Sequence, residues 1–153
     1  MDGGDFVGSH FYTAALSLST RTTIFRYELN QTNLMNETQI HIVMPYGLQG
    51  GILDFFIQGD NVIFYFLDDK RRNSAVYRAN LNNINEPSKF LSAGYFPGLA
   101  SAAGPSSFYA LDKQGFALEL DSGTGKVIRT SSQSTASSGY EGFGLTLGEC
   151  EQK

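Results

Sequence analysis

The sequence of 153 residues contains a single cysteine, Cys150, and only two histidines, His10 and His41. One thiol cannot form an internal disulfide, so the fold does not depend on cross-links. These three residues also lack the ligand spacing of a zinc site, and no acid, base and nucleophile converge in the sequence pattern. We therefore predict no metal ion, no cofactor and no catalytic residue.

Positive charge is scarce and spread along the chain. Eleven Lys and Arg residues stand against fifteen Asp and Glu residues, which gives a formal net charge of −4. The basic residues are scattered except for Lys70-Arg71-Arg72, so the sequence has no electrostatic footprint for a phosphate backbone. Nucleic acid is not an expected partner.

Long hydrophobic runs are absent as well. The apolar stretches are only a few residues long, and the acidic N-terminus, Met1 to Asp5, lacks the apolar core of a signal peptide. We expect a soluble protein with neither a membrane span nor a signal peptide. The compartment stays open, because a piece cut from a secreted parent protein would look the same.

Turn residues and aromatic residues are abundant by contrast. Seventeen Gly, eight Tyr and twelve Phe accompany a charged fraction of only 17%. This composition favours many short strands over long helices. The length suits one domain with a sizeable core. We predict a single all-β domain over residues 1–153.

Short apolar or alternating segments between turn residues predict the strands. Phe116 to Leu120 is the clearest, because every second residue is Phe or Leu. Ile52 to Gln58 and Val62 to Leu67 are almost continuously apolar, which predicts interior strands with other sheets on either side. The other predicted strands are His10–Ser19, Thr22–Leu29, Gln39–Val43, Ser74–Leu81, Ser88–Ser92, Phe108–Leu111, Lys126–Thr130 and Gly142–Leu147.

The same pattern of strands occurs three times. Each copy has an aromatic residue, Leu four positions later and then Asn or Asp, and the three sets are Phe25/Leu29/Asn30, Tyr77/Leu81/Asn82 and Phe116/Leu120/Asp121. Strands led by glycine recur at Gly51, Gly98 and Gly142. Such repeats predict four-stranded units over 5–44, 50–93 and 97–131, with an extra end strand at 142–147. The alignment predicts that Leu29, Leu81 and Leu120 are buried at equivalent positions.

These units resemble the blades of β-propellers. Phe108-Tyr-Ala-Leu-Asp112, followed by Thr124-Gly-Lys-Val127, is similar to a quinoprotein-type blade. Phe64-Tyr-Phe-Leu-Asp68 with Val76 to Leu81 is similar to blades of the Tyr-Trp-Thr-Asp type. The chain has no tryptophan, so it lacks the Trp that closes a quinoprotein blade and the Trp-Asp pair of WD40 repeats. The resemblance implies three four-stranded antiparallel units, a partial propeller, and no particular activity.

Several side chains are candidates for a role in binding or modification. The aromatic residues near the entries of successive units are candidates for a binding face, with core packing as the other role open to them: Tyr46, Tyr95, Phe96, Tyr140 and Phe143. Asn30 and Asn36 begin two N-glycosylation acceptor sequences in a predicted polar loop, residues 30–37, as in a secreted parent. Asp54 is unusual because it lies inside an apolar strand.

The sequence favours a non-catalytic binding or scaffolding module whose loops recognise a protein or a glycan. The alternative is a fragment of a propeller enzyme, of the hydrolase or quinone-dependent dehydrogenase type, without a complete active site. Propellers need four to eight blades to close, and three are predicted. We therefore expect either a homodimer that completes a ring or the remaining blades of a parent protein. Exchange of the end strand 142–147 would join the homodimer if the chain begins at the second strand of a unit, near Phe11.

Overall fold

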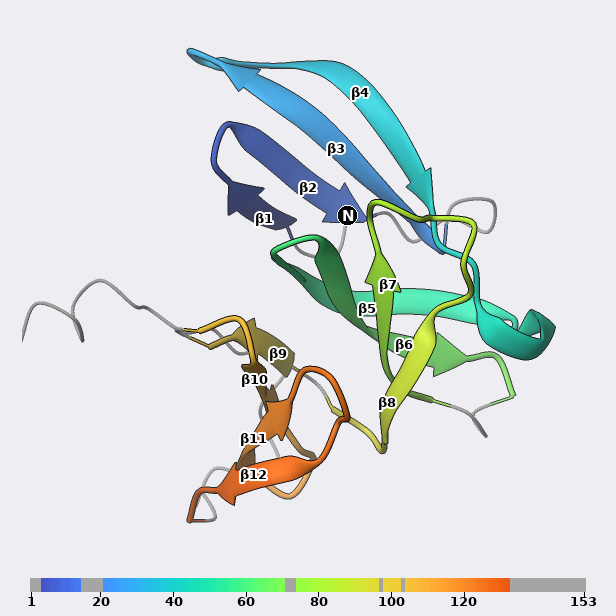
Figure 1. Cartoon of the computed structure of the whole chain (residues 1–153), viewed down its shortest axis with the longest axis vertical. Coiled ribbons are helices and arrows are strands. Elements are labelled where there is room, and N and C mark those ends of the chain that lie inside the picture. The colour runs from blue at the N-terminus through green and yellow to red at the C-terminus, as the bar shows by residue number, and fades with distance from the viewer. Residues whose placement is uncertain (1–3, 15–20, 71–73, 97, 103, 133–153) are drawn as a thin grey trace, which may run out of the picture.

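The computed structural model describes residues 4–14, 21–70, 74–96, 98–102 and 104–132. These residues form three four-stranded antiparallel sheets and one short 3-10 turn, η1 (Pro45–Gly47). Figure 1 shows the sheets following one another, with the first uppermost, the second in the middle and the third below. The all-β prediction is confirmed, whereas the predicted strand 142–147 lies outside the described residues.

Each sheet is a simple meander in which neighbours in the sequence are neighbours in space. The first sheet contains β1 (Gly4–Val7), β2 (His10–Ala14), β3 (Thr23–Asn30) and β4 (Asn33–His41). The second contains β5 (Gly50–Gln58), β6 (Asn61–Asp68), β7 (Ala75–Asn80) and β8 (Lys89–Ala93). The third contains β9 (Gly98–Ser101), β10 (Ser107–Leu111), β11 (Ala117–Asp121) and β12 (Val127–Thr130).

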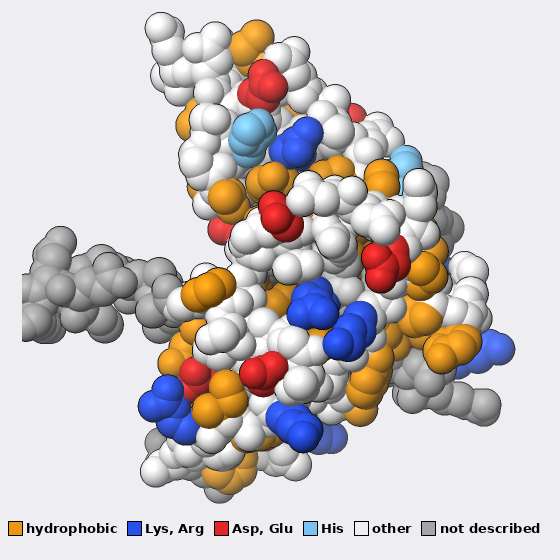
Figure 2. Space-filling view, viewed as in Figure 1, with side chains coloured by type: hydrophobic (Ala, Val, Ile, Leu, Met, Phe, Trp, Pro, Cys, Tyr) orange, Lys and Arg blue, Asp and Glu red, His pale blue; other side chains and the backbone are white. Residues whose placement is uncertain are grey.

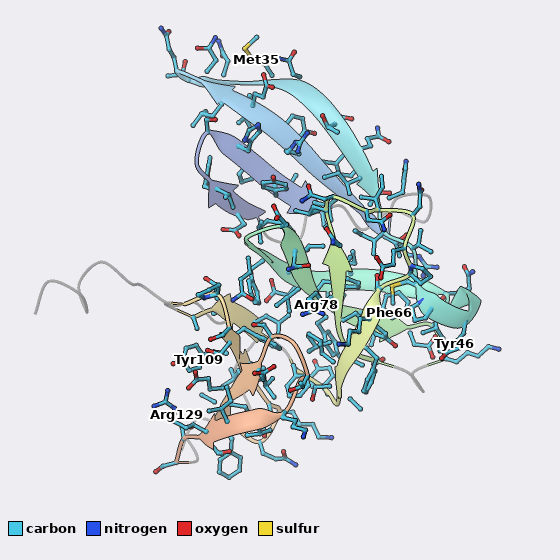
Figure 3. All side chains as sticks on the ribbon, in the orientation of Figure 1. Met35, Tyr46, Phe66, Arg78, Tyr109 and Arg129 are labelled. Atoms are coloured by element: carbon cyan, nitrogen blue, oxygen red, sulfur yellow. The ribbon has the colours of Figure 1, made fainter. Side chains whose placement is uncertain are left out.

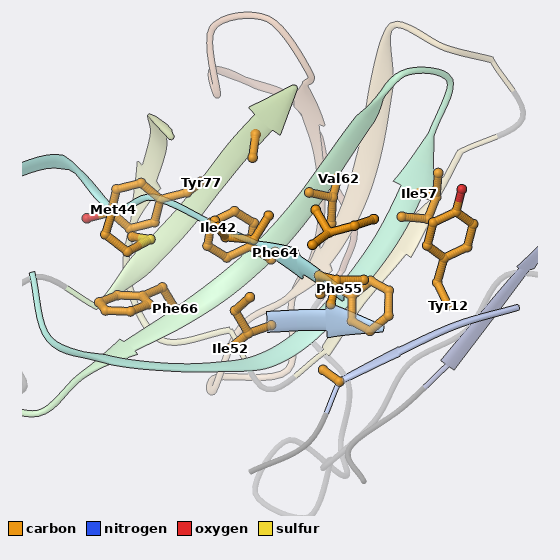
Figure 4. Packing of buried hydrophobic residues seen from close by; sticks show 14 of the residues in the cluster. Tyr12, Ile42, Met44, Ile52, Phe55, Ile57, Val62, Phe64, Phe66 and Tyr77 are labelled. Atoms are coloured by element: carbon orange, nitrogen blue, oxygen red, sulfur yellow. The ribbon is translucent and has the colours of Figure 1, made fainter. Parts of the chain in front are cut away.

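The second sheet is packed on both faces. Val62 and Phe64 of β6 point into a core shared with the first sheet, whereas Ile63 and Tyr65, the alternate residues, point into a core shared with the third. Figure 4 shows the first of these cores. Fully burying one such apolar side chain stabilises the fold by about 1.5–3 kcal/mol. The predicted sheets on both sides are therefore confirmed, since continuous apolarity serves two interfaces. β6 is an interior strand as predicted, but β5 lies at an edge of its sheet.

Two aspartates join the first strands of successive sheets, β1, β5 and β9, which we call the innermost strands. Asp5 of β1 accepts a hydrogen bond from the Ile57 amide of β5, and Asp54 of β5 accepts one from the Leu99 amide of β9, each at 2.9 Å. Burial raises the pKa of both carboxyl groups, and the backbone bonds partly offset this. The unusual position of Asp54 in an apolar strand is explained by this contact between sheets.

The prediction of a polar loop over residues 30–37 is wrong, because most of these residues belong to strands. β3 continues to Asn30 and β4 begins at Asn33, so the loop is a tight turn in which Gln31 has a φ of 55°. Most of β4 is exposed, and an exposed edge strand can be polar on both faces. The expected alternation of apolar and polar residues is therefore missing, although the strand is present.

The predicted alignment of the repeat is wrong in the third sheet. One backbone hydrogen bond recurs at the open end of the hairpin formed by the second and third strands of each sheet: Leu29 N to Ser9 O, Leu81 N to Asp60 O and Ser122 N to Ser106 O. Leu29 and Leu81 are therefore equivalent to each other, but Leu120 lies two residues before the matching position. Leu120 is fully buried, Leu81 is partly buried and Leu29 is 38% exposed, so the three leucines do not share one environment.

The first sheet already has its innermost strand. β1 (Gly4–Val7) pairs with β2 from Gly4 opposite Thr13 to Val7 opposite His10. The prediction that the chain begins at the second strand of a unit is therefore wrong. An end strand from a second chain would find no vacant position beside β2, because β1 already occupies it.

Candidate functional site

Three connections meet at one end of the second sheet. They are the segment 42–49, which contains η1 and leads from β4 to β5, the described residues Asp69, Lys70 and Ser74 between β6 and β7, and residues 94–96 after β8. Antiparallel strands alternate in direction, so every second connection lies at the same end. The exposed aromatic residues at this end come from different strands and loops.

A pocket of about 400 Å³ lies at this end, on the face of the second sheet that points towards η1. We call it the aromatic pocket. Among the described residues its lining contains no charged side chain; these lining residues are Pro45, Tyr46, Leu48, Ser74, Ala75, Tyr77, Phe90 and Ala93. In Figure 2, hydrophobic side chains gather over β8 and towards η1, with basic side chains beside them. The pocket is suited to apolar contact rather than to ion pairing.

Tyr77 and Phe90 form the aromatic wall of the pocket. They are opposite each other in the β7–β8 register, and their ring centroids are 5.9 Å apart in an edge-to-face arrangement. Tyr77 is buried and also packs edge-to-face on Phe66, whereas Phe90 is 53% exposed. Burial raises the pKa of the Tyr77 hydroxyl, and the nearby Asp68 carboxylate adds to this. The wall is therefore fixed at its base and open at its rim.

Tyr46 projects from the η1 turn at the mouth of the pocket. Its side chain is 98% exposed, and Figure 3 shows it at the edge of the molecule. Its φ of 57° is in the left-handed region, which costs a non-glycine residue about 1 kcal/mol or more. Pro45 precedes it, and the Leu48 amide donates a hydrogen bond to the Pro45 carbonyl at 3.2 Å. A strained turn thus holds a large aromatic side chain in solvent.

The other predicted aromatic candidates lie in different environments. Tyr95 is half-exposed and packs edge-on against Tyr65 at 6.1 Å. Phe96 is buried between the second and third sheets, where it also packs against Tyr65, so its side chain does not belong to an open face. Tyr140 and Phe143 lie outside the described residues.

The two predicted glycosylation asparagines lie on the β3–β4 hairpin. Asn30 and Asn36 are both exposed. The Asn36 amide donates a hydrogen bond to the Glu28 carboxylate at 2.7 Å, and the Asn30 amide donates to the Met35 sulfur at 3.5 Å. Glycosylation at these positions stays a prediction.

Sequence reasoning identified Tyr46 but missed Phe90 and Tyr77 as parts of the same site. Each belongs to a predicted strand, and neither strand alone indicates a pocket. The signal is the cross-strand pairing of two aromatic residues beside a Pro-Tyr-Gly turn, which requires the β7–β8 register. That register shifts between Val76 and Tyr77, so counting along the strands would have misplaced the pair.

The described residues contain neither a candidate metal site nor a candidate membrane-spanning helix. Within them, no three His, Cys, Asp or Glu side chains are grouped so that they could hold a metal ion. No helix in the same part of the chain is long and apolar enough to cross a membrane.

Comparison with solved structures identifies the architecture. The structure of apo AztD from Citrobacter koseri, a propeller protein, matches with a TM-score of 0.58 and 10% identity over 90% of this chain. The WD40 domain of Toxoplasma gondii coronin matches with a TM-score of 0.53 and 11% identity over 82% of this chain. The chain has a β-propeller fold. Its three sheets are blades, named blade 1, blade 2 and blade 3 in chain order.

The chain spans about a third of the length of these two neighbours, covering 36% of the AztD chain and 31% of the coronin chain. No protein-family model matches the chain, and no curated protein has a matching sequence. At about 10% identity the similarity establishes the fold alone.

Proposed function

We propose that this chain is a non-catalytic binding module and that the aromatic pocket at the end of blade 2 recognises a segment of another protein. The observation that carries this proposal is the side chain of Tyr46, which a strained turn holds 98% exposed beside an apolar pocket. An exposed tyrosine next to a hydrophobic hollow is typical of the anchor residues of protein interfaces.

The chemistry of the pocket favours a peptide segment over a glycan. Among the described lining residues only Ser74, Tyr46 and Tyr77 carry side-chain hydroxyls, and the Ser74 hydroxyl already accepts a bond from the Asp68 amide. A sugar ring needs several hydrogen-bonding partners, because each hydroxyl that loses water without a partner costs free energy. An aliphatic or aromatic side chain needs only burial against Tyr77 and Phe90.

Selection from a random-peptide phage library tests the proposal directly. The wild-type chain serves as the target, and the Tyr46→Ala protein removes peptides that bind elsewhere. Affinities of the selected peptides are then measured by fluorescence anisotropy for wild type, Tyr46→Ala and Phe90→Ala. We expect each substitution to weaken binding about tenfold or more, because truncating an interface anchor costs more than about 1 kcal/mol.

Val127→Ser provides the matched control, since Val127 is similarly exposed but lies on β12 of blade 3. Its affinity should equal that of the wild type. A glycan array is screened with the same four proteins. Glycan binding that depends on Tyr46 would mean that the pocket recognises a glycan and not a protein segment. Peptide binding that is equally strong in all four proteins would contradict the proposal that the aromatic pocket is the binding site.

A further inference from the structure

The three blades contain equivalent positions that face the preceding blade. The recurring backbone bonds donated by the amides of Leu29, Leu81 and Ser122 set this equivalence. In β6 these positions are Val62 and Phe64, and in β10 they are Phe108 and Ala110. All four side chains are fully buried against the preceding blade. The equivalent residues of β2 in blade 1 are Phe11 and Thr13.

Blade 1 therefore has a receiving face against which no other described blade packs, although Thr13 at its centre is buried. Phe6 and Phe11 on this face have ring centroids 4.7 Å apart, and Phe6 is 60% exposed. Tyr27 and Phe25 occupy the positions that Ala79 and Tyr77 hold in blade 2; both are half-buried here, whereas their counterparts are buried. A contiguous aromatic surface of this kind on a sheet is typical of an interface. We call it the blade 1 face.

Blade 3 has the opposite face, the one that corresponds to contacts with a following blade. Tyr109, Ala117, Glu119 and Arg129 line a shallow pocket of about 320 Å³ there. Glu119 is almost fully buried; its carboxylate accepts hydrogen bonds from the Ser107 hydroxyl and from Arg129 Nε, each at 2.7 Å. Arg129 itself is 76% exposed. We call this surface the blade 3 face.

The contact between blades 2 and 3 indicates what Arg129 can reach. Lys89 of β8 donates a hydrogen bond to the Gly123 carbonyl in the β11–β12 turn, and Arg78 of β7 donates to the Ser122 carbonyl in the same turn. Lys89 pairs with Arg78 in blade 2 as Arg129 pairs with Glu119 in blade 3. Arg129 is thus the counterpart of Lys89 and would meet the outer hairpin of a following blade.

The outer hairpin of blade 1, formed by β3 and β4, has the complementary charge. Glu37 accepts hydrogen bonds from the Tyr27 hydroxyl at 3.1 Å and from the Gln39 side-chain amide at 3.0 Å, and it is exposed. Glu28 lies on the same hairpin. A cation on the blade 3 face therefore matches acids on the hairpin that borders the blade 1 face.

We propose that the blade 3 face of one chain packs on the blade 1 face of a second copy, so that two chains form a closed ring of six blades. Six lies within the four to eight blades of closed propellers. Both contacts in this ring are identical, and each joins two different faces, as ring symmetry requires. Phe6, Phe11 and Tyr27 become buried in the ring, as their counterparts Ile57, Val62 and Ala79 are in blade 2.

Two variants test the contact from its two sides. Phe6→Asp places a charge on the blade 1 face, and Ala117→Arg places a bulky charge on the blade 3 face; both positions are at least partly exposed, so the blades themselves should stay folded. Circular dichroism checks the fold. Multi-angle light scattering after size exclusion measures the mass. We expect a wild-type dimer and a monomer for each single variant.

An equimolar mixture of the two variants is the decisive sample. Each variant retains the face that the other has lost, so the mixture should regain a dimer through one intact contact, at a higher protein concentration than the wild type needs. Tyr46→Ser, which alters neither face, should stay dimeric. A monomeric wild type would overturn the proposal. A dimer that is lost in Phe6→Asp but kept in Ala117→Arg would also overturn the proposal, because that result means that the blade 1 faces of the two chains contact each other.

Discussion

Substitution of Gly125 by alanine tests whether blade 3 packs on blade 2 through the β11–β12 turn. Gly125 has a φ of +75°, and an added Cβ would lie 1.9 Å from the Leu91 carbonyl oxygen and 2.4 Å from its carbon. Both atoms are backbone atoms of β8, so neither can move aside independently. The turn must therefore retreat from blade 2.

The expected loss of stability has two parts. The left-handed conformation costs alanine about 1–2 kcal/mol. Retreat of the turn also weakens the bond from Arg78 to the Ser122 carbonyl at 2.8 Å, and a partly buried bond from a charged donor is worth about 1.5–3 kcal/mol. The bond from the exposed Lys89 adds little, because solvent screens it. Gly125→Ala should therefore cost about 2.5–5 kcal/mol of unfolding free energy.

Gly59→Ala is the matched control. Gly59 has a φ of +59° in the β5–β6 turn, and an added Cβ would have no atom within 4 Å. It should cost only the conformational part, about 1–2 kcal/mol. Urea unfolding followed by circular dichroism measures both values. Losses within about 0.5 kcal/mol of each other would refute the packing of the turn on β8.

Three further predictions concern burial and charge. Leu120→Ala should cost about 2–5 kcal/mol in urea unfolding and Leu29→Ala about 1 kcal/mol or less, because only Leu120 is fully buried; equal losses would restore the original repeat alignment. Burial raises the pKa of Asp54 above its unfolded value of about 4, so its stabilising contribution is complete below that pH and is lost as the pH rises through the folded-state pKa. Wild type should therefore lose stability relative to Asp54→Asn between pH 4 and pH 7, and parallel pH profiles would contradict this. Phe96→Ala should cost about 3–5 kcal/mol, whereas Tyr46→Ala should leave the unfolding midpoint unchanged; a large shift for Tyr46→Ala would mean that its side chain supports the turn.

Much of the architecture was predictable because burial leaves a pattern in the sequence. The continuous apolar runs around Phe56 and Phe64 indicated a sheet packed on both faces. The hairpin at Gln31 was missed because an exposed polar ribbon has no such pattern. The repeat was misaligned at Leu120 because several strands carry an aromatic residue at more than one position, and only the hydrogen bonds at the open end of each hairpin settle the register.

The candidate site was predictable only in part, for a related reason. Tyr46 stands in a Pro-Tyr-Gly turn, and turn chemistry is local. Phe90 becomes part of the pocket only through its cross-strand contact with Tyr77, which depends on an irregular register. Phe96 and Tyr95 are adjacent in the sequence, yet one is buried and the other half-exposed, because the chain there enters the contact between blades 2 and 3.

Residue-level hydrogen exchange, measured by NMR on the full chain, tests most directly whether three blades stack with blade 2 in the middle. β6 is buried on both faces and paired on both edges, so its amides should exchange only through global unfolding. The outermost strand β12 is exposed along its whole length, and its amides should exchange orders of magnitude faster. Equal protection of β6 and β12, or faster exchange in β6, would contradict the stacked arrangement.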